Sequence, residues 1–302
     1  MFESQYEDQV RLLLRCLPYI SKHKCFALKG GTAINLFLQD LPRISVDIDL
    51  TYLPLKPRQE ALEEIHEGLK LIKDEITKHN PDAHVNEKYV KKYLIKLFVS
   101  TRDAVIKIEP NVVFRGFVYE PQDLDLCSSA QDYFQSFVST KTMSIADLYG
   151  SKLCATLDRQ HPRDLFDVKL LMDSQGITPE IRRAFIVYLA GHPRLMSELL
   201  SPRIVDIDKI YNDHFTGMVL DEVPLDDLKE IQRILPKFLV RGLDADEKEF
   251  LLSMKRGEPD WRCLGFDHLD RLPALRWKLI NIQNMDSNKH KKALERLTEI
   301  LQ

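Results

Sequence analysis

Two acidic residues, Asp47 and Asp49, lie two positions apart in a short apolar run. Alternate side chains of a β-strand point to the same face, so a strand here would place both carboxylates side by side. Neighbouring carboxylates repel each other unless a cation lies between them. Oxygen-only ligands suit Mg²⁺, which also keeps water molecules and binds substrate phosphates. The pair therefore predicts a Mg²⁺ site that serves phosphoryl or nucleotidyl transfer.

A glycine pair, Gly30 and Gly31, lies shortly upstream and opens an apolar helix pattern over residues 31–38. Glycine lets backbone N–H groups approach a phosphate closely, and the helix N-terminus adds its positive end. Together with Thr32, the glycines are predicted to cradle phosphate groups of a substrate. A phosphate cradle followed by a metal-binding pair is suited to the transfer of a nucleotidyl or phosphoryl group.

Arg43 and Ser45 stand between the glycine pair and the carboxylates. Arg43 either holds the loop or nucleotide, or forms a structural ion pair. Ser45 shares the strand face of Asp47, so it either donates a hydrogen bond to a phosphate or caps a turn.

The arrangement Gly-Gly-Thr, helix, Arg-x-Ser-x-Asp-x-Asp resembles the nucleotidyltransferase toxins of the AbiEii/AbiGii family, within the DNA polymerase beta-like superfamily. The broader superfamily pattern has Gly-Ser before the acidic pair, and here Thr32 stands near the serine position. The resemblance covers about residues 25–175. It implies an α+β fold in which a mixed sheet with flanking helices is followed by an all-helical region.

A third carboxylate is predicted at Glu109, at the end of a strand pattern over residues 104–109. If Ile106 and Ile108 share a core with Ile48, Glu109 lies on the same outer face as the acidic pair. The alternative is a surface glutamate at a strand end before a proline. The superfamily resemblance also implies a third metal-binding acid from such a later strand.

A second cluster follows the helix pattern over residues 145–158, whose apolar stripe includes Lys152. A lysine there either extends to solvent or is directed at an anion. The family resemblance implies a lysine followed by Arg-Asp-x-x-Asp, here Arg163, Asp164 and Asp167. Lys152 would contact the triphosphate, and Arg163 would bind phosphate oxygens or pair with Asp167. Asp164 is the preferred partner that orients the lysine or accepts a proton. The alternative is that Arg163 and Asp164 only complement the helix dipole.

The chain of 302 residues predicts a nucleotidyltransferase domain over 1–143 and a helical domain over 144–302, because no strong strand pattern follows Met143. Five scattered cysteines without a Cys-x-x-Cys pair indicate free thiols in a reducing cytoplasm. No run approaches the ~20 apolar residues of a membrane helix, and the acidic N-terminus is unlike a secretory signal.

The net charge of −3 gives no general attraction to nucleic acid, so RNA binding requires a local patch. Seven Lys and Arg residues against two acids lie between Lys88 and Arg115, with Tyr89 and Tyr93 among them. This run either follows an RNA backbone or is a solvated strand face.

The sequence therefore predicts a Mg²⁺-dependent transfer of NMP from an NTP to an acceptor hydroxyl. The resemblance implies a bacterial type IV toxin or phage-defence role, a separate antitoxin and an RNA acceptor such as the tRNA 3′ end. The alternatives are a nucleotidyltransferase that modifies a small molecule or a protein, and a nucleotide-binding module without catalysis.

Overall fold

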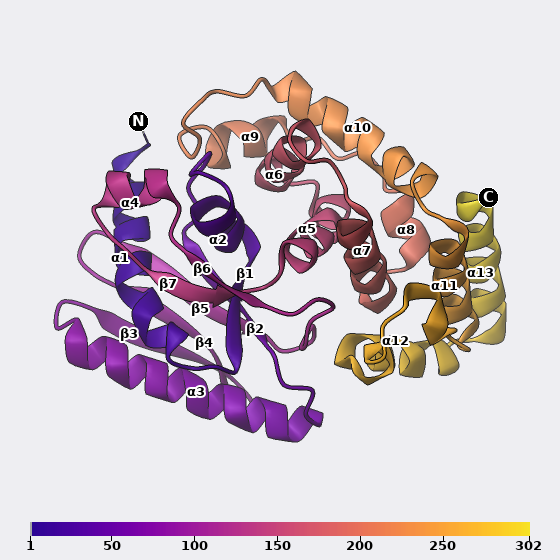
Figure 1. The fold of residues 1–302 in the computed structure, drawn as a ribbon, viewed down its shortest axis with the longest axis horizontal. Coiled ribbons are helices and arrows are strands. Elements are labelled where there is room, and N and C mark those ends of the chain that lie inside the picture. Colours follow the sequence, from indigo (N-terminus) through magenta and orange to yellow (C-terminus); the bar gives the residue numbers. More distant parts are fainter. Residues whose placement is uncertain (1) are drawn as a thin grey trace. The chain divides into compact units, whose positions relative to one another are not determined.

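The computed structural model describes residues 2–302, and its N-terminal part is built on a mixed β-sheet (Figure 1). Within these residues the sheet has seven strands in the order β3-β4-β5-β2-β1-β7-β6. β1 pairs antiparallel with β2 and parallel with β7, and β2 runs parallel to β5. The strands are β1 (Phe26–Lys29), β2 (Asp47–Tyr52), β3 (His84–Val90), β4 (Tyr93–Ser100), β5 (Val105–Asn111), β6 (Gln122–Asp125) and β7 (Ser139–Thr142).

The core face of the sheet is apolar where β2 and β5 meet. Ile48, Leu50, Ile106 and Ile108 are at most 2% exposed. α1 (Ser4–Ser21) and α3 (Arg58–His79) pack against the sheet, α1 on β5 and β7 and α3 on β4. Because side chains alternate along a strand, this shared core places the acidic residues of β2 and β5 on the opposite face.

β5 ends at Asn111, and residues 112–118 are irregular. The side-chain Oδ1 of Asn111 accepts the N–H groups of Val113 and Phe114, both at 2.9 Å. Such a side-chain turn replaces the ladder hydrogen bonds that would continue the strand.

Residues 119–140 contain β6, α4 (Ser128–Phe134) and the start of β7. The predicted helix over 31–38 is confirmed, as α2 (Gly30–Ala33) continued directly by a π-helical turn, Ile34–Leu38.

The chain divides into two compact units, one of residues 2–144 with Thr216–Glu222, the other of Ile145–Phe215 with Val223–Gln302. The short return segment is joined to the first unit by backbone hydrogen bonds from Ile44 to Met218 (2.7 Å) and from Leu220 to Pro42 (3.3 Å). The second unit is helical. Its α-helices are α5 (Ile145–Arg159), α6 (Pro162–Asp173), α7 (Pro179–Gly191), α8 (Met196–Leu200), α9 (Asp208–His214), α10 (Leu225–Arg241), α11 (Ala245–Arg256), α12 (Pro273–Gln283) and α13 (Ser287–Leu301).

In residues 2–302 no helix combines the length and apolar character needed to cross a membrane.

α5 and α7 pack closely at Gly150. A Cβ atom on Gly150 would lie 2.7 Å from the backbone nitrogen of Phe185 and 2.8 Å from the Cβ of Ala184. Since backbone atoms of a packed helix cannot move aside, this contact requires glycine at position 150.

We therefore expect Gly150→Ala to lower the free energy of unfolding by about 1–3 kcal/mol, despite the better helix propensity of alanine. The neighbouring Ser151→Ala is the control and should cost less than about 1 kcal/mol. Urea denaturation measures both variants. Equal stability of Gly150→Ala and the wild type would contradict the close packing of α5 on α7.

Candidate active site

A row of charged side chains crosses three adjacent strands of the sheet. In the parallel pair of β2 and β5, Asp47 lies opposite Lys107 and Asp49 lies opposite Glu109. In the antiparallel pair of β1 and β2, Lys29 lies opposite Asp49. Directly paired residues of adjacent strands share one face of the sheet. The structure thus brings the three predicted carboxylates to one face.

Lysine side chains fill the space around Glu109. Lys107 Nζ lies 3.5 Å from Asp47 Oδ2 and 3.2 Å from Glu109 Oε2, and Lys96 Nζ lies 2.9 Å from the same Glu109 oxygen. Burial alone would raise the pKa of Glu109, but the hydrogen bonds and charges of the two lysines lower it. Within residues 2–302, no group of three or more Asp, Glu, His or Cys side chains is arranged to hold a metal ion. Glu109 as a third metal ligand therefore stays a prediction.

Asp47 and Asp49 present a donor set that fits a divalent cation. Burial is the main cause of the raised pKa of Asp49, and the negative charges of Asp47 and Glu109 add to it, whereas Lys29 and Lys107 oppose it. The side chain of Asp47 is 41% exposed and accessible to solvent. The ion pair of Lys107 Nζ with Asp47 shows that the Asp47 carboxylate already attracts a cationic group.

The glycine pair lies directly against this acidic face. Gly30 has a φ of +74°, and a Cβ atom there would lie 3.0 Å from Asp49 Oδ2. A Cβ on Gly31 would lie 2.8 Å from Ser45 Oγ and 2.9 Å from a terminal guanidinium nitrogen of Arg43. Both positions thus favour glycine, Gly30 because of its left-handed backbone and Gly31 because of its close neighbours.

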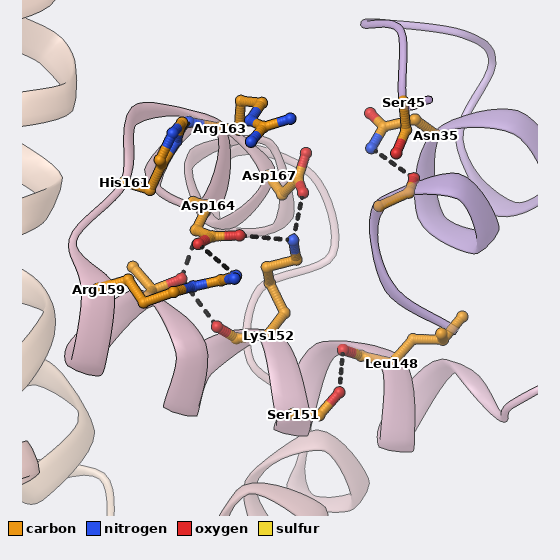
Figure 2. A network of polar contacts seen from close by, with 12 residues as sticks. Asn35, Ser45, Leu148, Ser151, Lys152, Arg159, His161, Arg163, Asp164 and Asp167 are labelled. Carbon is orange, nitrogen blue, oxygen red and sulfur yellow. Dashed lines mark hydrogen bonds and ion pairs between the residues drawn. The ribbon is translucent and has the colours of Figure 1, made fainter. Parts of the chain in front are cut away.

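Thr32 connects the glycine turn to β2. Its hydroxyl donates to the backbone carbonyl of Asp47 and lies 3.1 Å from Ser45 Oγ in a second hydrogen bond. The side-chain amide of Asn35 donates to the carbonyl of Gly31 at 2.9 Å (Figure 2). Asn35 was not among the predicted site residues. These bonds fix the glycine turn beside the acidic pair.

Arg43, predicted to hold either the loop or the nucleotide, has a loop contact in the structure. Its guanidinium donates to the carbonyl of Ile44 at 2.8 Å, and the residue is 2% exposed.

The second cluster lies within the helical unit, where α5 meets α6 (Figure 2). Lys152 Nζ lies 2.8 Å from Asp164 Oδ1 and 2.8 Å from Asp167 Oδ2, and Lys152 itself is 7% exposed. The lysine therefore does not extend to solvent, so the first of the two interpretations of Lys152 is wrong. The structure thus brings Lys152, Asp164 and Asp167 of the predicted second cluster together.

Arg159 completes this cluster and was not predicted. Its guanidinium lies 2.7 Å from Asp164 Oδ2, so Asp164 bridges Arg159 and Lys152. His161 caps α6 by accepting the N–H of Arg163 on its Nδ1 at 3.2 Å. The only sequence signal for Arg159 was a basic residue in the last turn of the preceding helix.

The fold is that of a nucleotidyltransferase toxin. MenT4, a nucleotidyltransferase toxin from Mycobacterium tuberculosis H37Rv, superimposes with a TM-score of 0.58 and 16% sequence identity, over 99% of this chain and 96% of that one. The family model of the nucleotidyl transferase AbiEii toxin of type IV toxin-antitoxin systems matches residues 11–281, and the chain belongs to this family. A comparison with curated proteins found no match.

Membership confirms the predicted family, the fold class and the nucleotidyltransferase activity. The chain is a nucleotidyltransferase toxin of the type IV class, for which the family implies an NTP as substrate and an antitoxin as partner. Nucleotidyltransferases of this kind generally use divalent metal ions.

Proposed function

We propose that this toxin is a Mg²⁺-dependent enzyme that transfers NMP from an NTP to a hydroxyl of RNA, namely the 3′ end of tRNA. The observation that carries the proposal is the close approach of the glycine turn to the acidic pair, where the Cβ position of Gly30 lies 3.0 Å from Asp49 Oδ2. A triphosphate bound at the turn would have its reacting phosphate next to these carboxylates.

Asp47 and Asp49 would hold the metal ion, with Glu109 as the proposed third ligand. The chemistry that bound Mg²⁺ would supply is neutralisation of phosphate charge and activation of the acceptor hydroxyl. Asp49 is suited to this role because the raised pKa of its carboxyl reflects a buried negative charge that the protein alone does not fully compensate.

The backbone N–H groups of Gly30 and Gly31 would contact the β- and γ-phosphates, together with the hydroxyl of Ser45. Thr32 and Arg43 would contribute to phosphate binding mainly by holding the glycine turn in position. Their observed partners support this role, since Thr32 donates to the carbonyl of Asp47 and Arg43 packs at the Cβ position of Gly31.

Lys152 would supply a positive charge to the triphosphate, and Arg163 would bind further phosphate oxygens. Asp164 would either orient the lysine or accept the proton of the acceptor hydroxyl. Supporting this, Asp164 and Asp167 each lie 2.8 Å from Lys152 Nζ, so the ammonium group is fixed before substrate arrives.

An RNA acceptor is supported by the turn between β3 and β4, at the edge of the sheet. Lys88, Lys91 and Lys92 are exposed there, and Tyr89 is 45% exposed and offers a surface for base stacking. Fewer of the seven Lys and Arg residues between Lys88 and Arg115 contribute to this exposed patch than the sequence suggests. Lys96 and Lys107 are paired with acids, Arg115 is buried, and Arg102 lies in the turn at the other end of β4.

Lys107 lies where its charge opposes a metal ion held by Asp47. We expect Lys107→Met to tighten binding of Mn²⁺, used as a probe for Mg²⁺, by roughly tenfold, because one positive charge near the ligands is removed. Isothermal titration calorimetry without nucleotide measures the affinity. Lys88→Met, an exposed lysine of β3, is the control and should leave the affinity unchanged. Weaker Mn²⁺ binding by Lys107→Met would contradict a metal site at Asp47.

The function is tested by incubating the protein with total tRNA, Mg²⁺ and each α-labelled NTP in turn. We expect label on tRNA from a preferred NTP, none with a chelator present, and none with Asp49→Asn. Label on a protein or small molecule instead of RNA would overturn the proposed acceptor. NTP binding without pyrophosphate release would overturn catalysis itself.

A further inference from the structure

The helical unit contains a pocket remote in sequence from every residue of the proposed active site. The pocket is partly open, and its empty space together with the adjoining solvent amounts to about 460 Å³. Residues from α8, α11, α12, α13 and the segment before α8 line it. The apolar part of the lining includes Met196, Ile282, Met285 and Leu297.

Two buried lysines, Lys255 of α11 and Lys278 of α12, line this pocket. They are 3% and 7% exposed. Lys278 Nζ donates to the carbonyls of His192 and Arg194, both at 2.7 Å. Lys255 Nζ contacts the thioether sulfur of Met285 at 3.7 Å, which is a weak acceptor for an ammonium group.

Neither lysine is neutralised by an acid in the part of the chain that the structure describes. Burial lowers the pKa of Lys255 and no negative charge opposes it. Burial also lowers the pKa of Lys278, to about 8, with a further lowering from Lys255 and a small opposing effect from Glu198. Buried cations are normally paired, and leaving one unpaired costs folding free energy. Two such residues at one pocket are the donors that an anion would satisfy.

We propose that this pocket binds a small organic anion, whose carboxylate or phosphate group contacts Lys255 and Lys278 and whose apolar body lies against Met196, Ile282 and Leu297. Ser197, which is 2% exposed, supplies a hydroxyl at the same lining. This site is separate from the proposed nucleotide site, because none of its residues belongs to either catalytic cluster.

The test uses the full chain and three probes measured by calorimetry: phenyl phosphate, hexanoate and inorganic phosphate. We expect at least one of the two organic anions to bind more tightly than inorganic phosphate. Lys255→Met and Lys278→Met should each weaken that binding at least about tenfold, since each removes a charge-assisted hydrogen bond. The pair of organic probes distinguishes a phosphate ligand from a carboxylate ligand.

Both lysine variants should fold, because methionine is an unbranched side chain only one atom shorter than lysine and removes a buried charge. Thermal unfolding checks this directly, and Lys291→Met, an exposed lysine of α13, is the matched control. Organic anions that bind no more tightly than inorganic phosphate would overturn the proposed ligand class. Binding that survives in both lysine variants would place the anion elsewhere and overturn the site.

Discussion

Asp49→Asn is expected to reduce nucleotidyl transfer by at least about 10³-fold while leaving the protein as stable as the wild type or slightly more stable. The loss follows because asparagine keeps the shape of aspartate but removes the negative charge that holds the metal. Asp47→Asn should behave in the same way for activity. Initial rates at saturating NTP and Mg²⁺ measure the effect.

The stability of Asp49→Asn follows from the direction of the pKa shift. The pKa of Asp49 is raised in the folded protein, chiefly by burial, so the unfolded chain loses this proton at a lower pH than the folded one. At neutral pH the folded state therefore carries an unfavourable carboxylate, which asparagine removes. Asp123→Asn is the control, an exposed aspartate of β6 in the same sheet, and it should retain full activity. Asp49→Asn with more than a tenth of the wild-type rate would argue against metal binding at β2.

Lys152→Met is expected to lower both the transfer rate and the stability. It leaves Asp164 and Asp167 buried without their shared cation, which costs about 3–5 kcal/mol. The transfer rate should fall about 10²–10³-fold, the usual effect of removing one donor that stabilises transition-state charge. Denaturant unfolding and initial rates are measured on the same preparation.

The double variant Lys152→Met/Asp167→Asn separates these two roles. It removes one negative charge with the positive one, and Asp164 keeps its ion pair with Arg159. We expect most of the lost stability to return while the transfer rate stays low. Lys169→Met is the control, because that lysine forms a surface pair with Asp173 and should change stability by less than about 0.5 kcal/mol. Recovery of the transfer rate in the double variant would assign Lys152 a structural role alone.

The strand periodicity of the sequence was sufficient to predict which face of the sheet carries the acidic residues. Asp47 and Asp49 alternate with Ile48, and Glu109 alternates with Ile108, so burial of the isoleucines sets the direction of the acids. The same periodicity places Lys107 on that face. Its contact with Asp47 depends on the register between β2 and β5, which is a tertiary property that spacing within one strand does not specify.

Short polar elements were the part of the fold that the sequence did not reveal. β6 and β7 have four residues each, and their sequences Gln-Asp-Leu-Asp and Ser-Thr-Lys-Thr lack an apolar alternation. They form strands because β7 pairs with β1 and β6 pairs with β7 at one edge of the sheet. Likewise, the role of Thr32 could not be read from its type, since its hydroxyl partner is a backbone carbonyl 15 residues away.

The proposed activity requires a metal ion held by Asp47 and Asp49 beside the glycine turn, and a crystal structure with Mg²⁺ and a non-hydrolysable NTP analogue tests this site most directly. The predicted result is an ion bound by one oxygen of each carboxylate at about 2.0–2.1 Å, with the β- and γ-phosphates against the backbone of Gly30 and Gly31. A nucleotide and ion bound elsewhere, with both carboxylates free of metal, would contradict a metal site at Asp47 and Asp49.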